Sequence, residues 1–181
     1  MRTGKGSLHL FAHTVLVFAL VLSACAPKRE YRDDRSAIDL ADVGLTSVRS
    51  ASDAVPEAVY VRDESDLLAS YFDLPDYVPE LCILYAQEIA CLDEVGVFHV
   101  TDGASAASLA ALLRDAYLRP SYERNRDWYN SYMPHETPKL RDAEVRVFGN
   151  YVAYAILSPA SRAAFFSAIE AALSENAESR S

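Results

Sequence analysis

The chain has 181 residues, of which 51% are hydrophobic, and a formal net charge of −9 at pH 7. That length allows one domain with a sizeable core. Nucleic-acid binding needs clustered lysine and arginine, so the acidic balance excludes nucleic acid as an expected partner.

The first 24 residues have the three parts of an export signal. Arg2 and Lys5 give a positive start, residues 10–22 form the apolar run LFAHTVLVFALVL, and the small residues Ser23 and Ala24 follow. The run is shorter than the roughly 20 residues that a membrane-spanning helix needs, and its length is typical of a signal peptide. We therefore expect cleavage after residue 24, which leaves 157 residues and removes two positive charges, so that the net charge becomes −11.

The end of this signal, LSAC at residues 22–25, resembles the lipobox of bacterial lipoproteins. In such a sequence Cys25 receives diacylglycerol through a thioether, because its sulfur is nucleophilic, and becomes the new N-terminus. Two acyl chains, each contributing about 0.8 kcal/mol per buried methylene, hold a protein on a membrane without a spanning helix. We predict a lipoprotein, palmitate-bearing and lipid-anchored on the extracytoplasmic face of the cell membrane. The alternative is an ordinary secretory signal in which Cys25 falls by chance.

Residues 25–37 are predicted to be the lipidated cysteine and a solvated tether, because APKREYRDDRSA is charged and almost devoid of large aliphatic side chains. Residues 38–173 are predicted to form the folded domain, and residues 174–181 a polar tail.

Within the domain, residues 38–50 and a short stretch beginning near Asp63 are predicted helices. Residues 81–87 and 94–100 are predicted strands, because they are rich in β-branched and aromatic side chains. A helix is then expected to begin at Thr101 or Asp102 and to be limited by Pro120.

Residues 143–157 predict a β-hairpin. Gly149-Asn150 suits a two-residue turn that places Phe148 opposite Tyr151, and the alternation then predicts one apolar, buried face. Ser158 is a suitable N-cap for a final helix that carries an apolar stripe. The predicted fold is α+β: a single domain with an antiparallel sheet of about four strands, in two hairpins, and helices packed on it.

Two cysteines remain beyond the lipobox, Cys82 and Cys91. In an exported protein they could form a disulfide. The alternative, which we favour, is two buried thiols that act as small hydrophobic side chains.

The sequence contains no phosphate-binding glycine loop and no H-E-x-x-H, C-x-x-C or G-x-S-x-G motif. The mature chain has two histidines, His99 and His135, fewer than the three ligands of a usual catalytic zinc. Neighbouring carboxylates such as Asp93-Glu94 should point to opposite faces of a strand. We therefore predict no catalytic residue, no metal and no cofactor.

Residues 121–140, SYERNRDWYNSYMPHETPKL, have the most unusual local composition. Aromatic rings with polar tips are common on peptide- and sugar-binding surfaces, but they also cap the open end of a small sheet, and we favour that structural role. Pro134 and Pro138 predict a loop in the second half. The candidate binding surface comprises Trp128, Tyr129, Tyr132, His135 and Glu136.

Three of these stretches resemble a bacterial lipoprotein family known as domain of unknown function 4358. The resemblance lies in the strand Glu94–Phe98, in the Tyr132, Pro134 and Glu136 pattern, and in Gly149–Val152, and it covers residues 38–173. It implies an exported, membrane-tethered protein with no assigned activity, so no catalytic residue can be carried over.

The sequence therefore favours a non-catalytic binding or interaction module of the cell envelope, anchored to the membrane by its lipid. Its partner would be an envelope protein, a peptide or a small ligand. The alternative is an envelope hydrolase that uses Glu94, His99, His135 or Glu136.

Overall fold

A computed structural model describes residues 30–51, 60–63, 66–88 and 90–174. The chain separates into two compact units, Met1–Glu30 and Tyr31–Ser181, and the fold below is that of the second. The predicted signal, Cys25 and the tail from residue 175 lie outside the described residues. Within those residues, every helix is too short or too polar to cross a membrane.

Five antiparallel strands form one sheet in the order β1-β2-β3-β5-β4. The strands are β1 (Tyr60–Asp63), β2 (Glu80–Ala86), β3 (Glu94–His99), β4 (Glu144–Phe148) and β5 (Tyr151–Ile156). The helices are α2 (Ala37–Ala51), α3 (Asp66–Ala69), α4 (Gly103–Leu112), the π-helix η1 (Leu113–Leu118), α5 (Arg119–Tyr132), α6 (Thr137–Arg141) and α7 (Pro159–Ser174). The predicted α+β fold is confirmed, with β1 as a strand beyond the four expected.

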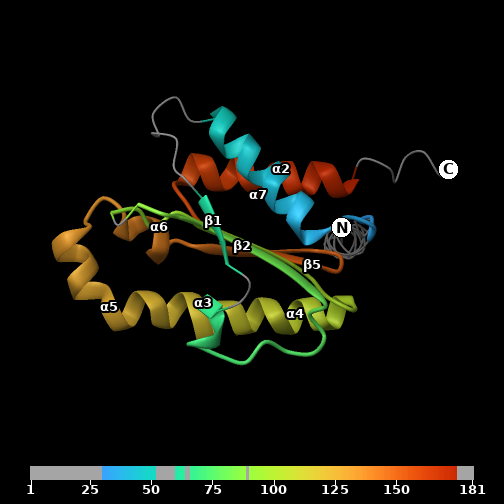
Figure 1. Cartoon of the computed structure of the whole chain (residues 1–181), viewed down its shortest axis with the longest axis horizontal. Helices are drawn as coiled ribbons and strands as arrows, with labels where there is room; N and C mark the ends of the chain where they lie inside the picture. Colours follow the sequence, from blue (N-terminus) through green and yellow to red (C-terminus); the bar gives the residue numbers. More distant parts are fainter. Residues whose placement is uncertain (1–29, 52–59, 64–65, 89, 175–181) are drawn as a thin grey trace, which may run out of the picture. The chain divides into compact units, whose positions relative to one another are not determined.

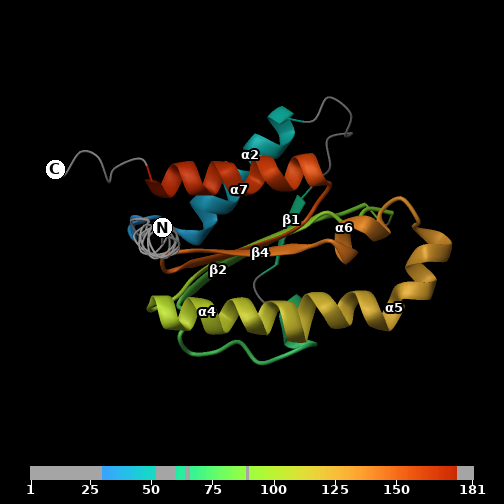
Figure 2. The ribbon, with the colours of Figure 1, turned by 180° about the vertical axis from the view of Figure 1, so that it is seen from behind.

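Helices cover both faces of the sheet. Figures 1 and 2 show α2 and α7 on one face and the line of α4, η1 and α5 on the other. Every residue of β5 is buried. Tyr151, Ala153 and Ala155 join the core under α2 and α7, whereas Val152 and Tyr154 join the core under α4. The prediction of a single buried face is therefore wrong, because the small alanines on the second face allow helices to pack there as well.

The β4–β5 hairpin has the predicted register. Phe148 lies opposite Tyr151 and Val145 lies opposite Tyr154. Gly149 has a φ of 61°, a conformation that glycine adopts without strain and that the tight turn requires.

The helix after β3 starts where expected, since the Asp102 carboxylate accepts hydrogen bonds of 2.8 Å from the N–H groups of Ala104 and Ser105. It does not stop at Pro120, however. The π-helix η1 precedes the proline, and the Arg119 N–H donates to the carbonyl of Arg114, five residues earlier. A regular α-helix would bring the proline ring against the carbonyl four residues back, and the wider π turn gives it room. The chain therefore continues as helix to Tyr132.

Part of the predicted tether is bound to the domain. The ring of Tyr31 meets that of Phe148 edge-on, with the centroids 5.8 Å apart. The Arg35 N–H donates to the Tyr151 hydroxyl, which in turn donates to the carbonyl of Arg35 at 2.7 Å.

A second set of contacts holds the same segment against the end of β3. Asp33 lies 2.7 Å from Nε2 of His99 and accepts a 2.9 Å hydrogen bond from the side-chain amide of Asn150. The prediction of a solvated tether through residue 37 is therefore wrong for Tyr31–Arg35. Asp33 has side-chain partners on the domain and Arg35 is held through its backbone, and a composition count does not reveal such contacts.

Candidate functional site

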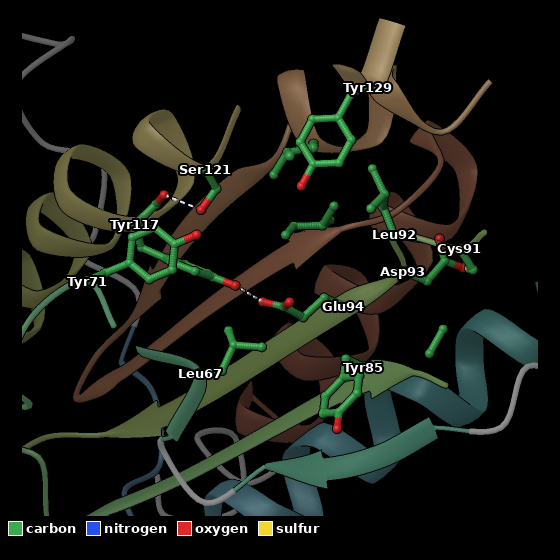
Figure 3. Close-up of a pocket in the computed structure, with 13 residues that line it drawn as sticks. Leu67, Tyr71, Tyr85, Cys91, Leu92, Asp93, Glu94, Tyr117, Ser121 and Tyr129 are labelled. Carbon is green, nitrogen blue, oxygen red and sulfur yellow. Dashed lines mark hydrogen bonds between the residues drawn. The ribbon is translucent and has the colours of Figure 1, made fainter. Parts of the chain in front are cut away.

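A pocket of about 240 Å³ lies between the sheet and the helical layer at the start of β3 (Figure 3). Its sheet side includes Tyr85 and Glu94, and its helical side includes Tyr117, Ser121 and Tyr129. Leu67, Tyr71, Ala86, Cys91, Leu92, Asp93, Leu140 and Ile156 complete the lining.

The floor of the pocket contains a buried carboxyl group. Glu94 is only 8% exposed, and the strand register places it between Tyr85 of β2 and Ile156 of β5. Its Oε1 accepts hydrogen bonds from the hydroxyls of Tyr117, at 2.6 Å, and Tyr154, at 2.5 Å. Burial, followed by the nearby charge of Glu94, raises the pKa of both tyrosines well above its usual range. Both phenols therefore stay protonated and donate to Glu94.

The helical wall has two tyrosines separated by a small residue. Tyr117, Ser121 and Tyr129 are spaced by four and eight residues, which brings them to one side of the helix. The Ser121 hydroxyl donates to the carbonyl of Tyr117 at 2.7 Å, so its polar group is satisfied within the helix. A serine here leaves open the space that a larger side chain would fill. Burial also raises the pKa of Tyr129.

An ion cluster adjoins the pocket through the lining residue Asp93. The Lys139 ammonium donates to Asp93 at 2.6 Å and to Glu136 at 2.8 Å, and Glu136 also accepts the N–H of Leu92 at 2.9 Å. Burial alone would lower the pKa of Lys139, but the hydrogen bonds that its ammonium donates to Asp93 and Glu136 outweigh this effect, and the pKa is raised. The cluster ties α6 to the loop before β3.

The same cluster bears on metal binding. Ligand atoms of Cys91, Asp93 and Glu136 lie within 4.8 Å of one another. Both carboxylates already face the Lys139 ammonium, so the position of a cation in this group is taken by a side chain of the protein.

Asp93 and Glu94 line the same pocket rather than pointing to opposite sides. The prediction of opposite faces is wrong because Asp93 precedes β3 and does not follow the alternation of the strand.

The aromatic residues of α5 divide into exposed and half-buried members. Trp128 is 52% and Tyr132 is 73% exposed, and their ring centroids lie 5.3 Å apart. Tyr129 is half-buried, lines the pocket and lies 5.4 Å from the Trp128 ring. The favoured prediction that this segment caps the sheet is therefore wrong for Trp128 and Tyr132. Figures 1 and 2 show the reason: because α5 continues after Pro120, its last turns lie past the end of the strands.

The two remaining members of the candidate surface differ from each other. His135 is exposed in the turn after α5, whereas Glu136 is half-buried and engaged by Lys139. The loop predicted for the second half is short, because Pro138 occupies the first turn of α6, a position that proline tolerates.

The residues of the alternative hydrolase site are not assembled. Glu94 begins β3 and faces the pocket, whereas His99 ends the strand and stacks on Tyr151 at 4.7 Å, in the other layer. His99 pairs with the Asp33 carboxylate, and neither residue lines the pocket.

Cys82 and Cys91 are both free thiols. Cys82 is buried in the core under α2 and α7, and Cys91 lines the pocket in the opposite layer, so the sheet separates them and the candidate disulfide is not formed. Burial raises the pKa of both thiols.

No protein-family model matches this chain, and neither a curated protein nor a solved structure matches it significantly. The resemblance to the lipoprotein family of unknown function stays a prediction.

Sequence reasoning missed the pocket. Glu94 and Tyr154 are 60 residues apart, and only the pairing of β3 with β5 brings them together. The sequence offers one signal, because Tyr117 and Ser121 are four residues apart and would share a helix face. The helix end expected at Pro120 separates these two residues, so the signal is lost.

Proposed function

We propose that this protein is a lipid-anchored, extracytoplasmic binding module of the cell envelope. The observation that carries the proposal is the exposed aromatic pair Trp128 and Tyr132 at the end of α5. Their partner would be an envelope protein, a peptide or a small ligand.

The exposed pair has contact area to offer. An aromatic side chain buries about 150–250 Å² when fully covered, so one that is half exposed can still bury about 100 Å² on a partner. At about 25 cal/mol per Å², each ring would contribute about 2.5 kcal/mol to binding. Trp and Tyr dominate binding energy at interfaces for this reason.

The turn between β4 and β5 and the end of α5 lie at opposite ends of the sheet (Figure 1). Six residue steps from Cys25 to Tyr31 span at most roughly 22 Å, and Tyr31 is bound beside Phe148 and the turn at Gly149. Lipidation of Cys25 would hold that end close to the membrane. The pocket and the end of α5 lie at the other end of β3, and would face outward.

The proposal is tested by crosslinking and co-purification from intact membranes. We expect the full-length wild type to capture a specific partner, and Trp128→Ala/Tyr132→Ala to lose it with little change in stability, because both side chains are exposed. Val147→Ala is the matched control, since Val147 is exposed at 40% on a different element, and it should retain the partner. Equal capture by the double variant and the wild type would contradict the proposed surface.

The anchor is tested separately with Cys25→Ser. We expect the variant to lose lipid-dependent maturation and to leave the membrane fraction. A Cys25→Ser protein that is still cleaved and still membrane-bound would refute the lipid anchor. The LSAC stretch at residues 22–25 supports this part of the proposal.

A further inference from the structure

We infer that the pocket above Glu94 binds a small organic ammonium ion, of the kind that carries a methylated or primary amine on a short chain. The inference extends the proposed binding function to a ligand class and rests on it, but it depends on different residues from the exposed pair.

The lining of the pocket is acidic. Asp93 and Glu94 both line the pocket, and none of its described lining residues is basic. Glu136 adds a third carboxylate nearby, and the Lys139 ammonium pairs with Glu136 and Asp93. Such a site favours a cation and disfavours phosphates and carboxylates.

The walls of the pocket are rich in aromatic rings. Figure 3 shows Tyr129 directed from α5 toward the space opposite Glu94, with Tyr71 and Tyr117 along one side. The rings of Tyr71 and Tyr117 meet edge-on at 4.9 Å, which fixes both. Aromatic rings around a cavity with a carboxylate are how proteins recognise alkylammonium groups, because the faces of the rings are electron-rich.

The lining does not suit calcium or magnesium. Calcium takes six to eight oxygen ligands and magnesium six. Apart from the carboxylates, this lining consists largely of rings and the aliphatic chains of Leu67, Leu92 and Leu140. An alkylammonium ion gains from such walls, since its methyl groups need apolar contact while its charge needs Glu94.

The volume sets the size of the ligand. About 240 Å³ is below the roughly 300–1,000 Å³ of sites for drug-sized molecules. The pocket therefore suits the head of a small amine rather than a peptide or an oligosaccharide.

The test is a titration of the full-length protein with choline, in a maltoside detergent that carries no ammonium group. Trp128 is the single tryptophan and its ring lies 5.4 Å from that of Tyr129, so its fluorescence reports on the pocket. We expect a saturable change with choline. We expect at least tenfold weaker binding of 3,3-dimethylbutanol, which has the same shape without the charge. Sodium chloride at matched ionic strength should have no effect.

Variants separate the sources of binding. Ser121→Leu fills the pocket and should abolish the response. Glu94→Gln keeps an oxygen that can accept from Tyr117 and Tyr154, and should weaken choline binding at least tenfold. Tyr129→Phe keeps the ring and should bind within about twofold of wild type, whereas Tyr129→Leu should lose about tenfold. If Ser121→Leu fails to fold, the Tyr129 pair still decides the question.

Three results would overturn the inference: no saturable response to choline, equal binding of 3,3-dimethylbutanol, or equal binding by Tyr129→Leu and Tyr129→Phe. Failure of the proposed surface is distinguishable from these results. It appears as unchanged partner capture by the Trp128 and Tyr132 double variant, while the wild-type protein still binds choline.

Discussion

Gly96→Ala is expected to destabilise the protein by clashing with the ring of Tyr154. An added Cβ at Gly96 would lie 2.2 Å from one ring carbon of Tyr154 and 2.8 Å from two others, well inside the roughly 3.5–4.0 Å of favourable carbon contact. The ring cannot easily move away. It is fully buried, lies against Phe98 and Tyr117, and donates to Glu94.

Overpacking of a core by one methyl group costs about 1–3 kcal/mol. We expect about 2 kcal/mol here, which lowers the melting temperature by about 4–8 °C in a domain of this size. The assay is thermal and urea unfolding of the full-length protein, followed by far-UV circular dichroism. Gly103→Ala is the matched control, because nothing lies within 4 Å of its Cβ position, and it should be neutral or slightly stabilising.

A double-mutant cycle identifies the cause. If the clash is with the ring, Tyr154→Leu should reduce the cost of Gly96→Ala by at least about 1 kcal/mol, since residues in contact are not additive. Additive effects, or equal stability of Gly96→Ala and Gly103→Ala, would refute the reasoning.

Lys139→Met should lower the free energy of unfolding by about 2 kcal/mol, because it leaves the largely buried Asp93 carboxylate without its ammonium partner. This value lies between the ~0–1 kcal/mol of an exposed ion pair and the ~3–5 kcal/mol of a broken buried pair. Urea unfolding measures this cost, and Lys139→Arg should recover part of it; a neutral Lys139→Met would show that the cluster does not hold the loop. The pKa of Lys139 is raised in the folded protein, so its contribution to stability should be complete below about pH 10.4, the unfolded value, and be lost as the pH rises through the folded pKa. An identical dependence of stability on alkaline pH in wild type and Lys139→Met would contradict this expectation. Cys82 should resist maleimide in the folded protein at pH 7 and Cys91 should react slowly, because burial raises the pKa of both thiols; peptide mapping by mass spectrometry checks this, and rapid labelling of Cys82 would be inconsistent with its place in the core.

Local patterns predicted much of the fold. The register of β4 and β5 follows from Gly149-Asn150 and the alternation around it, and Ser158 caps α7 as expected, with its hydroxyl accepting the N–H of Ser161 at 3.3 Å. These features depend on residues close together in the chain, so the sequence is enough to recognise them.

What the sequence could not predict depends on distant partners. Pro120 looked like a helix end, because nothing in the sequence indicates that the preceding turn is a π-helix. Asp33 and Arg35 looked solvated, although their partners His99 and Tyr151 lie more than 60 residues away. The pocket has the same origin, since Tyr117 and Tyr154 reach Glu94 from two different elements.

The most direct test of the binding surface is photo-crosslinking in intact cells with a photoreactive residue at position 132. The control carries the same residue at Val147, which is also exposed but lies on β4. We expect a discrete crosslinked species from the Tyr132 position and none from the Val147 position, both in the membrane fraction. Crosslinking of equal extent at the two positions, or at Val147 alone, would contradict a binding surface at the end of α5.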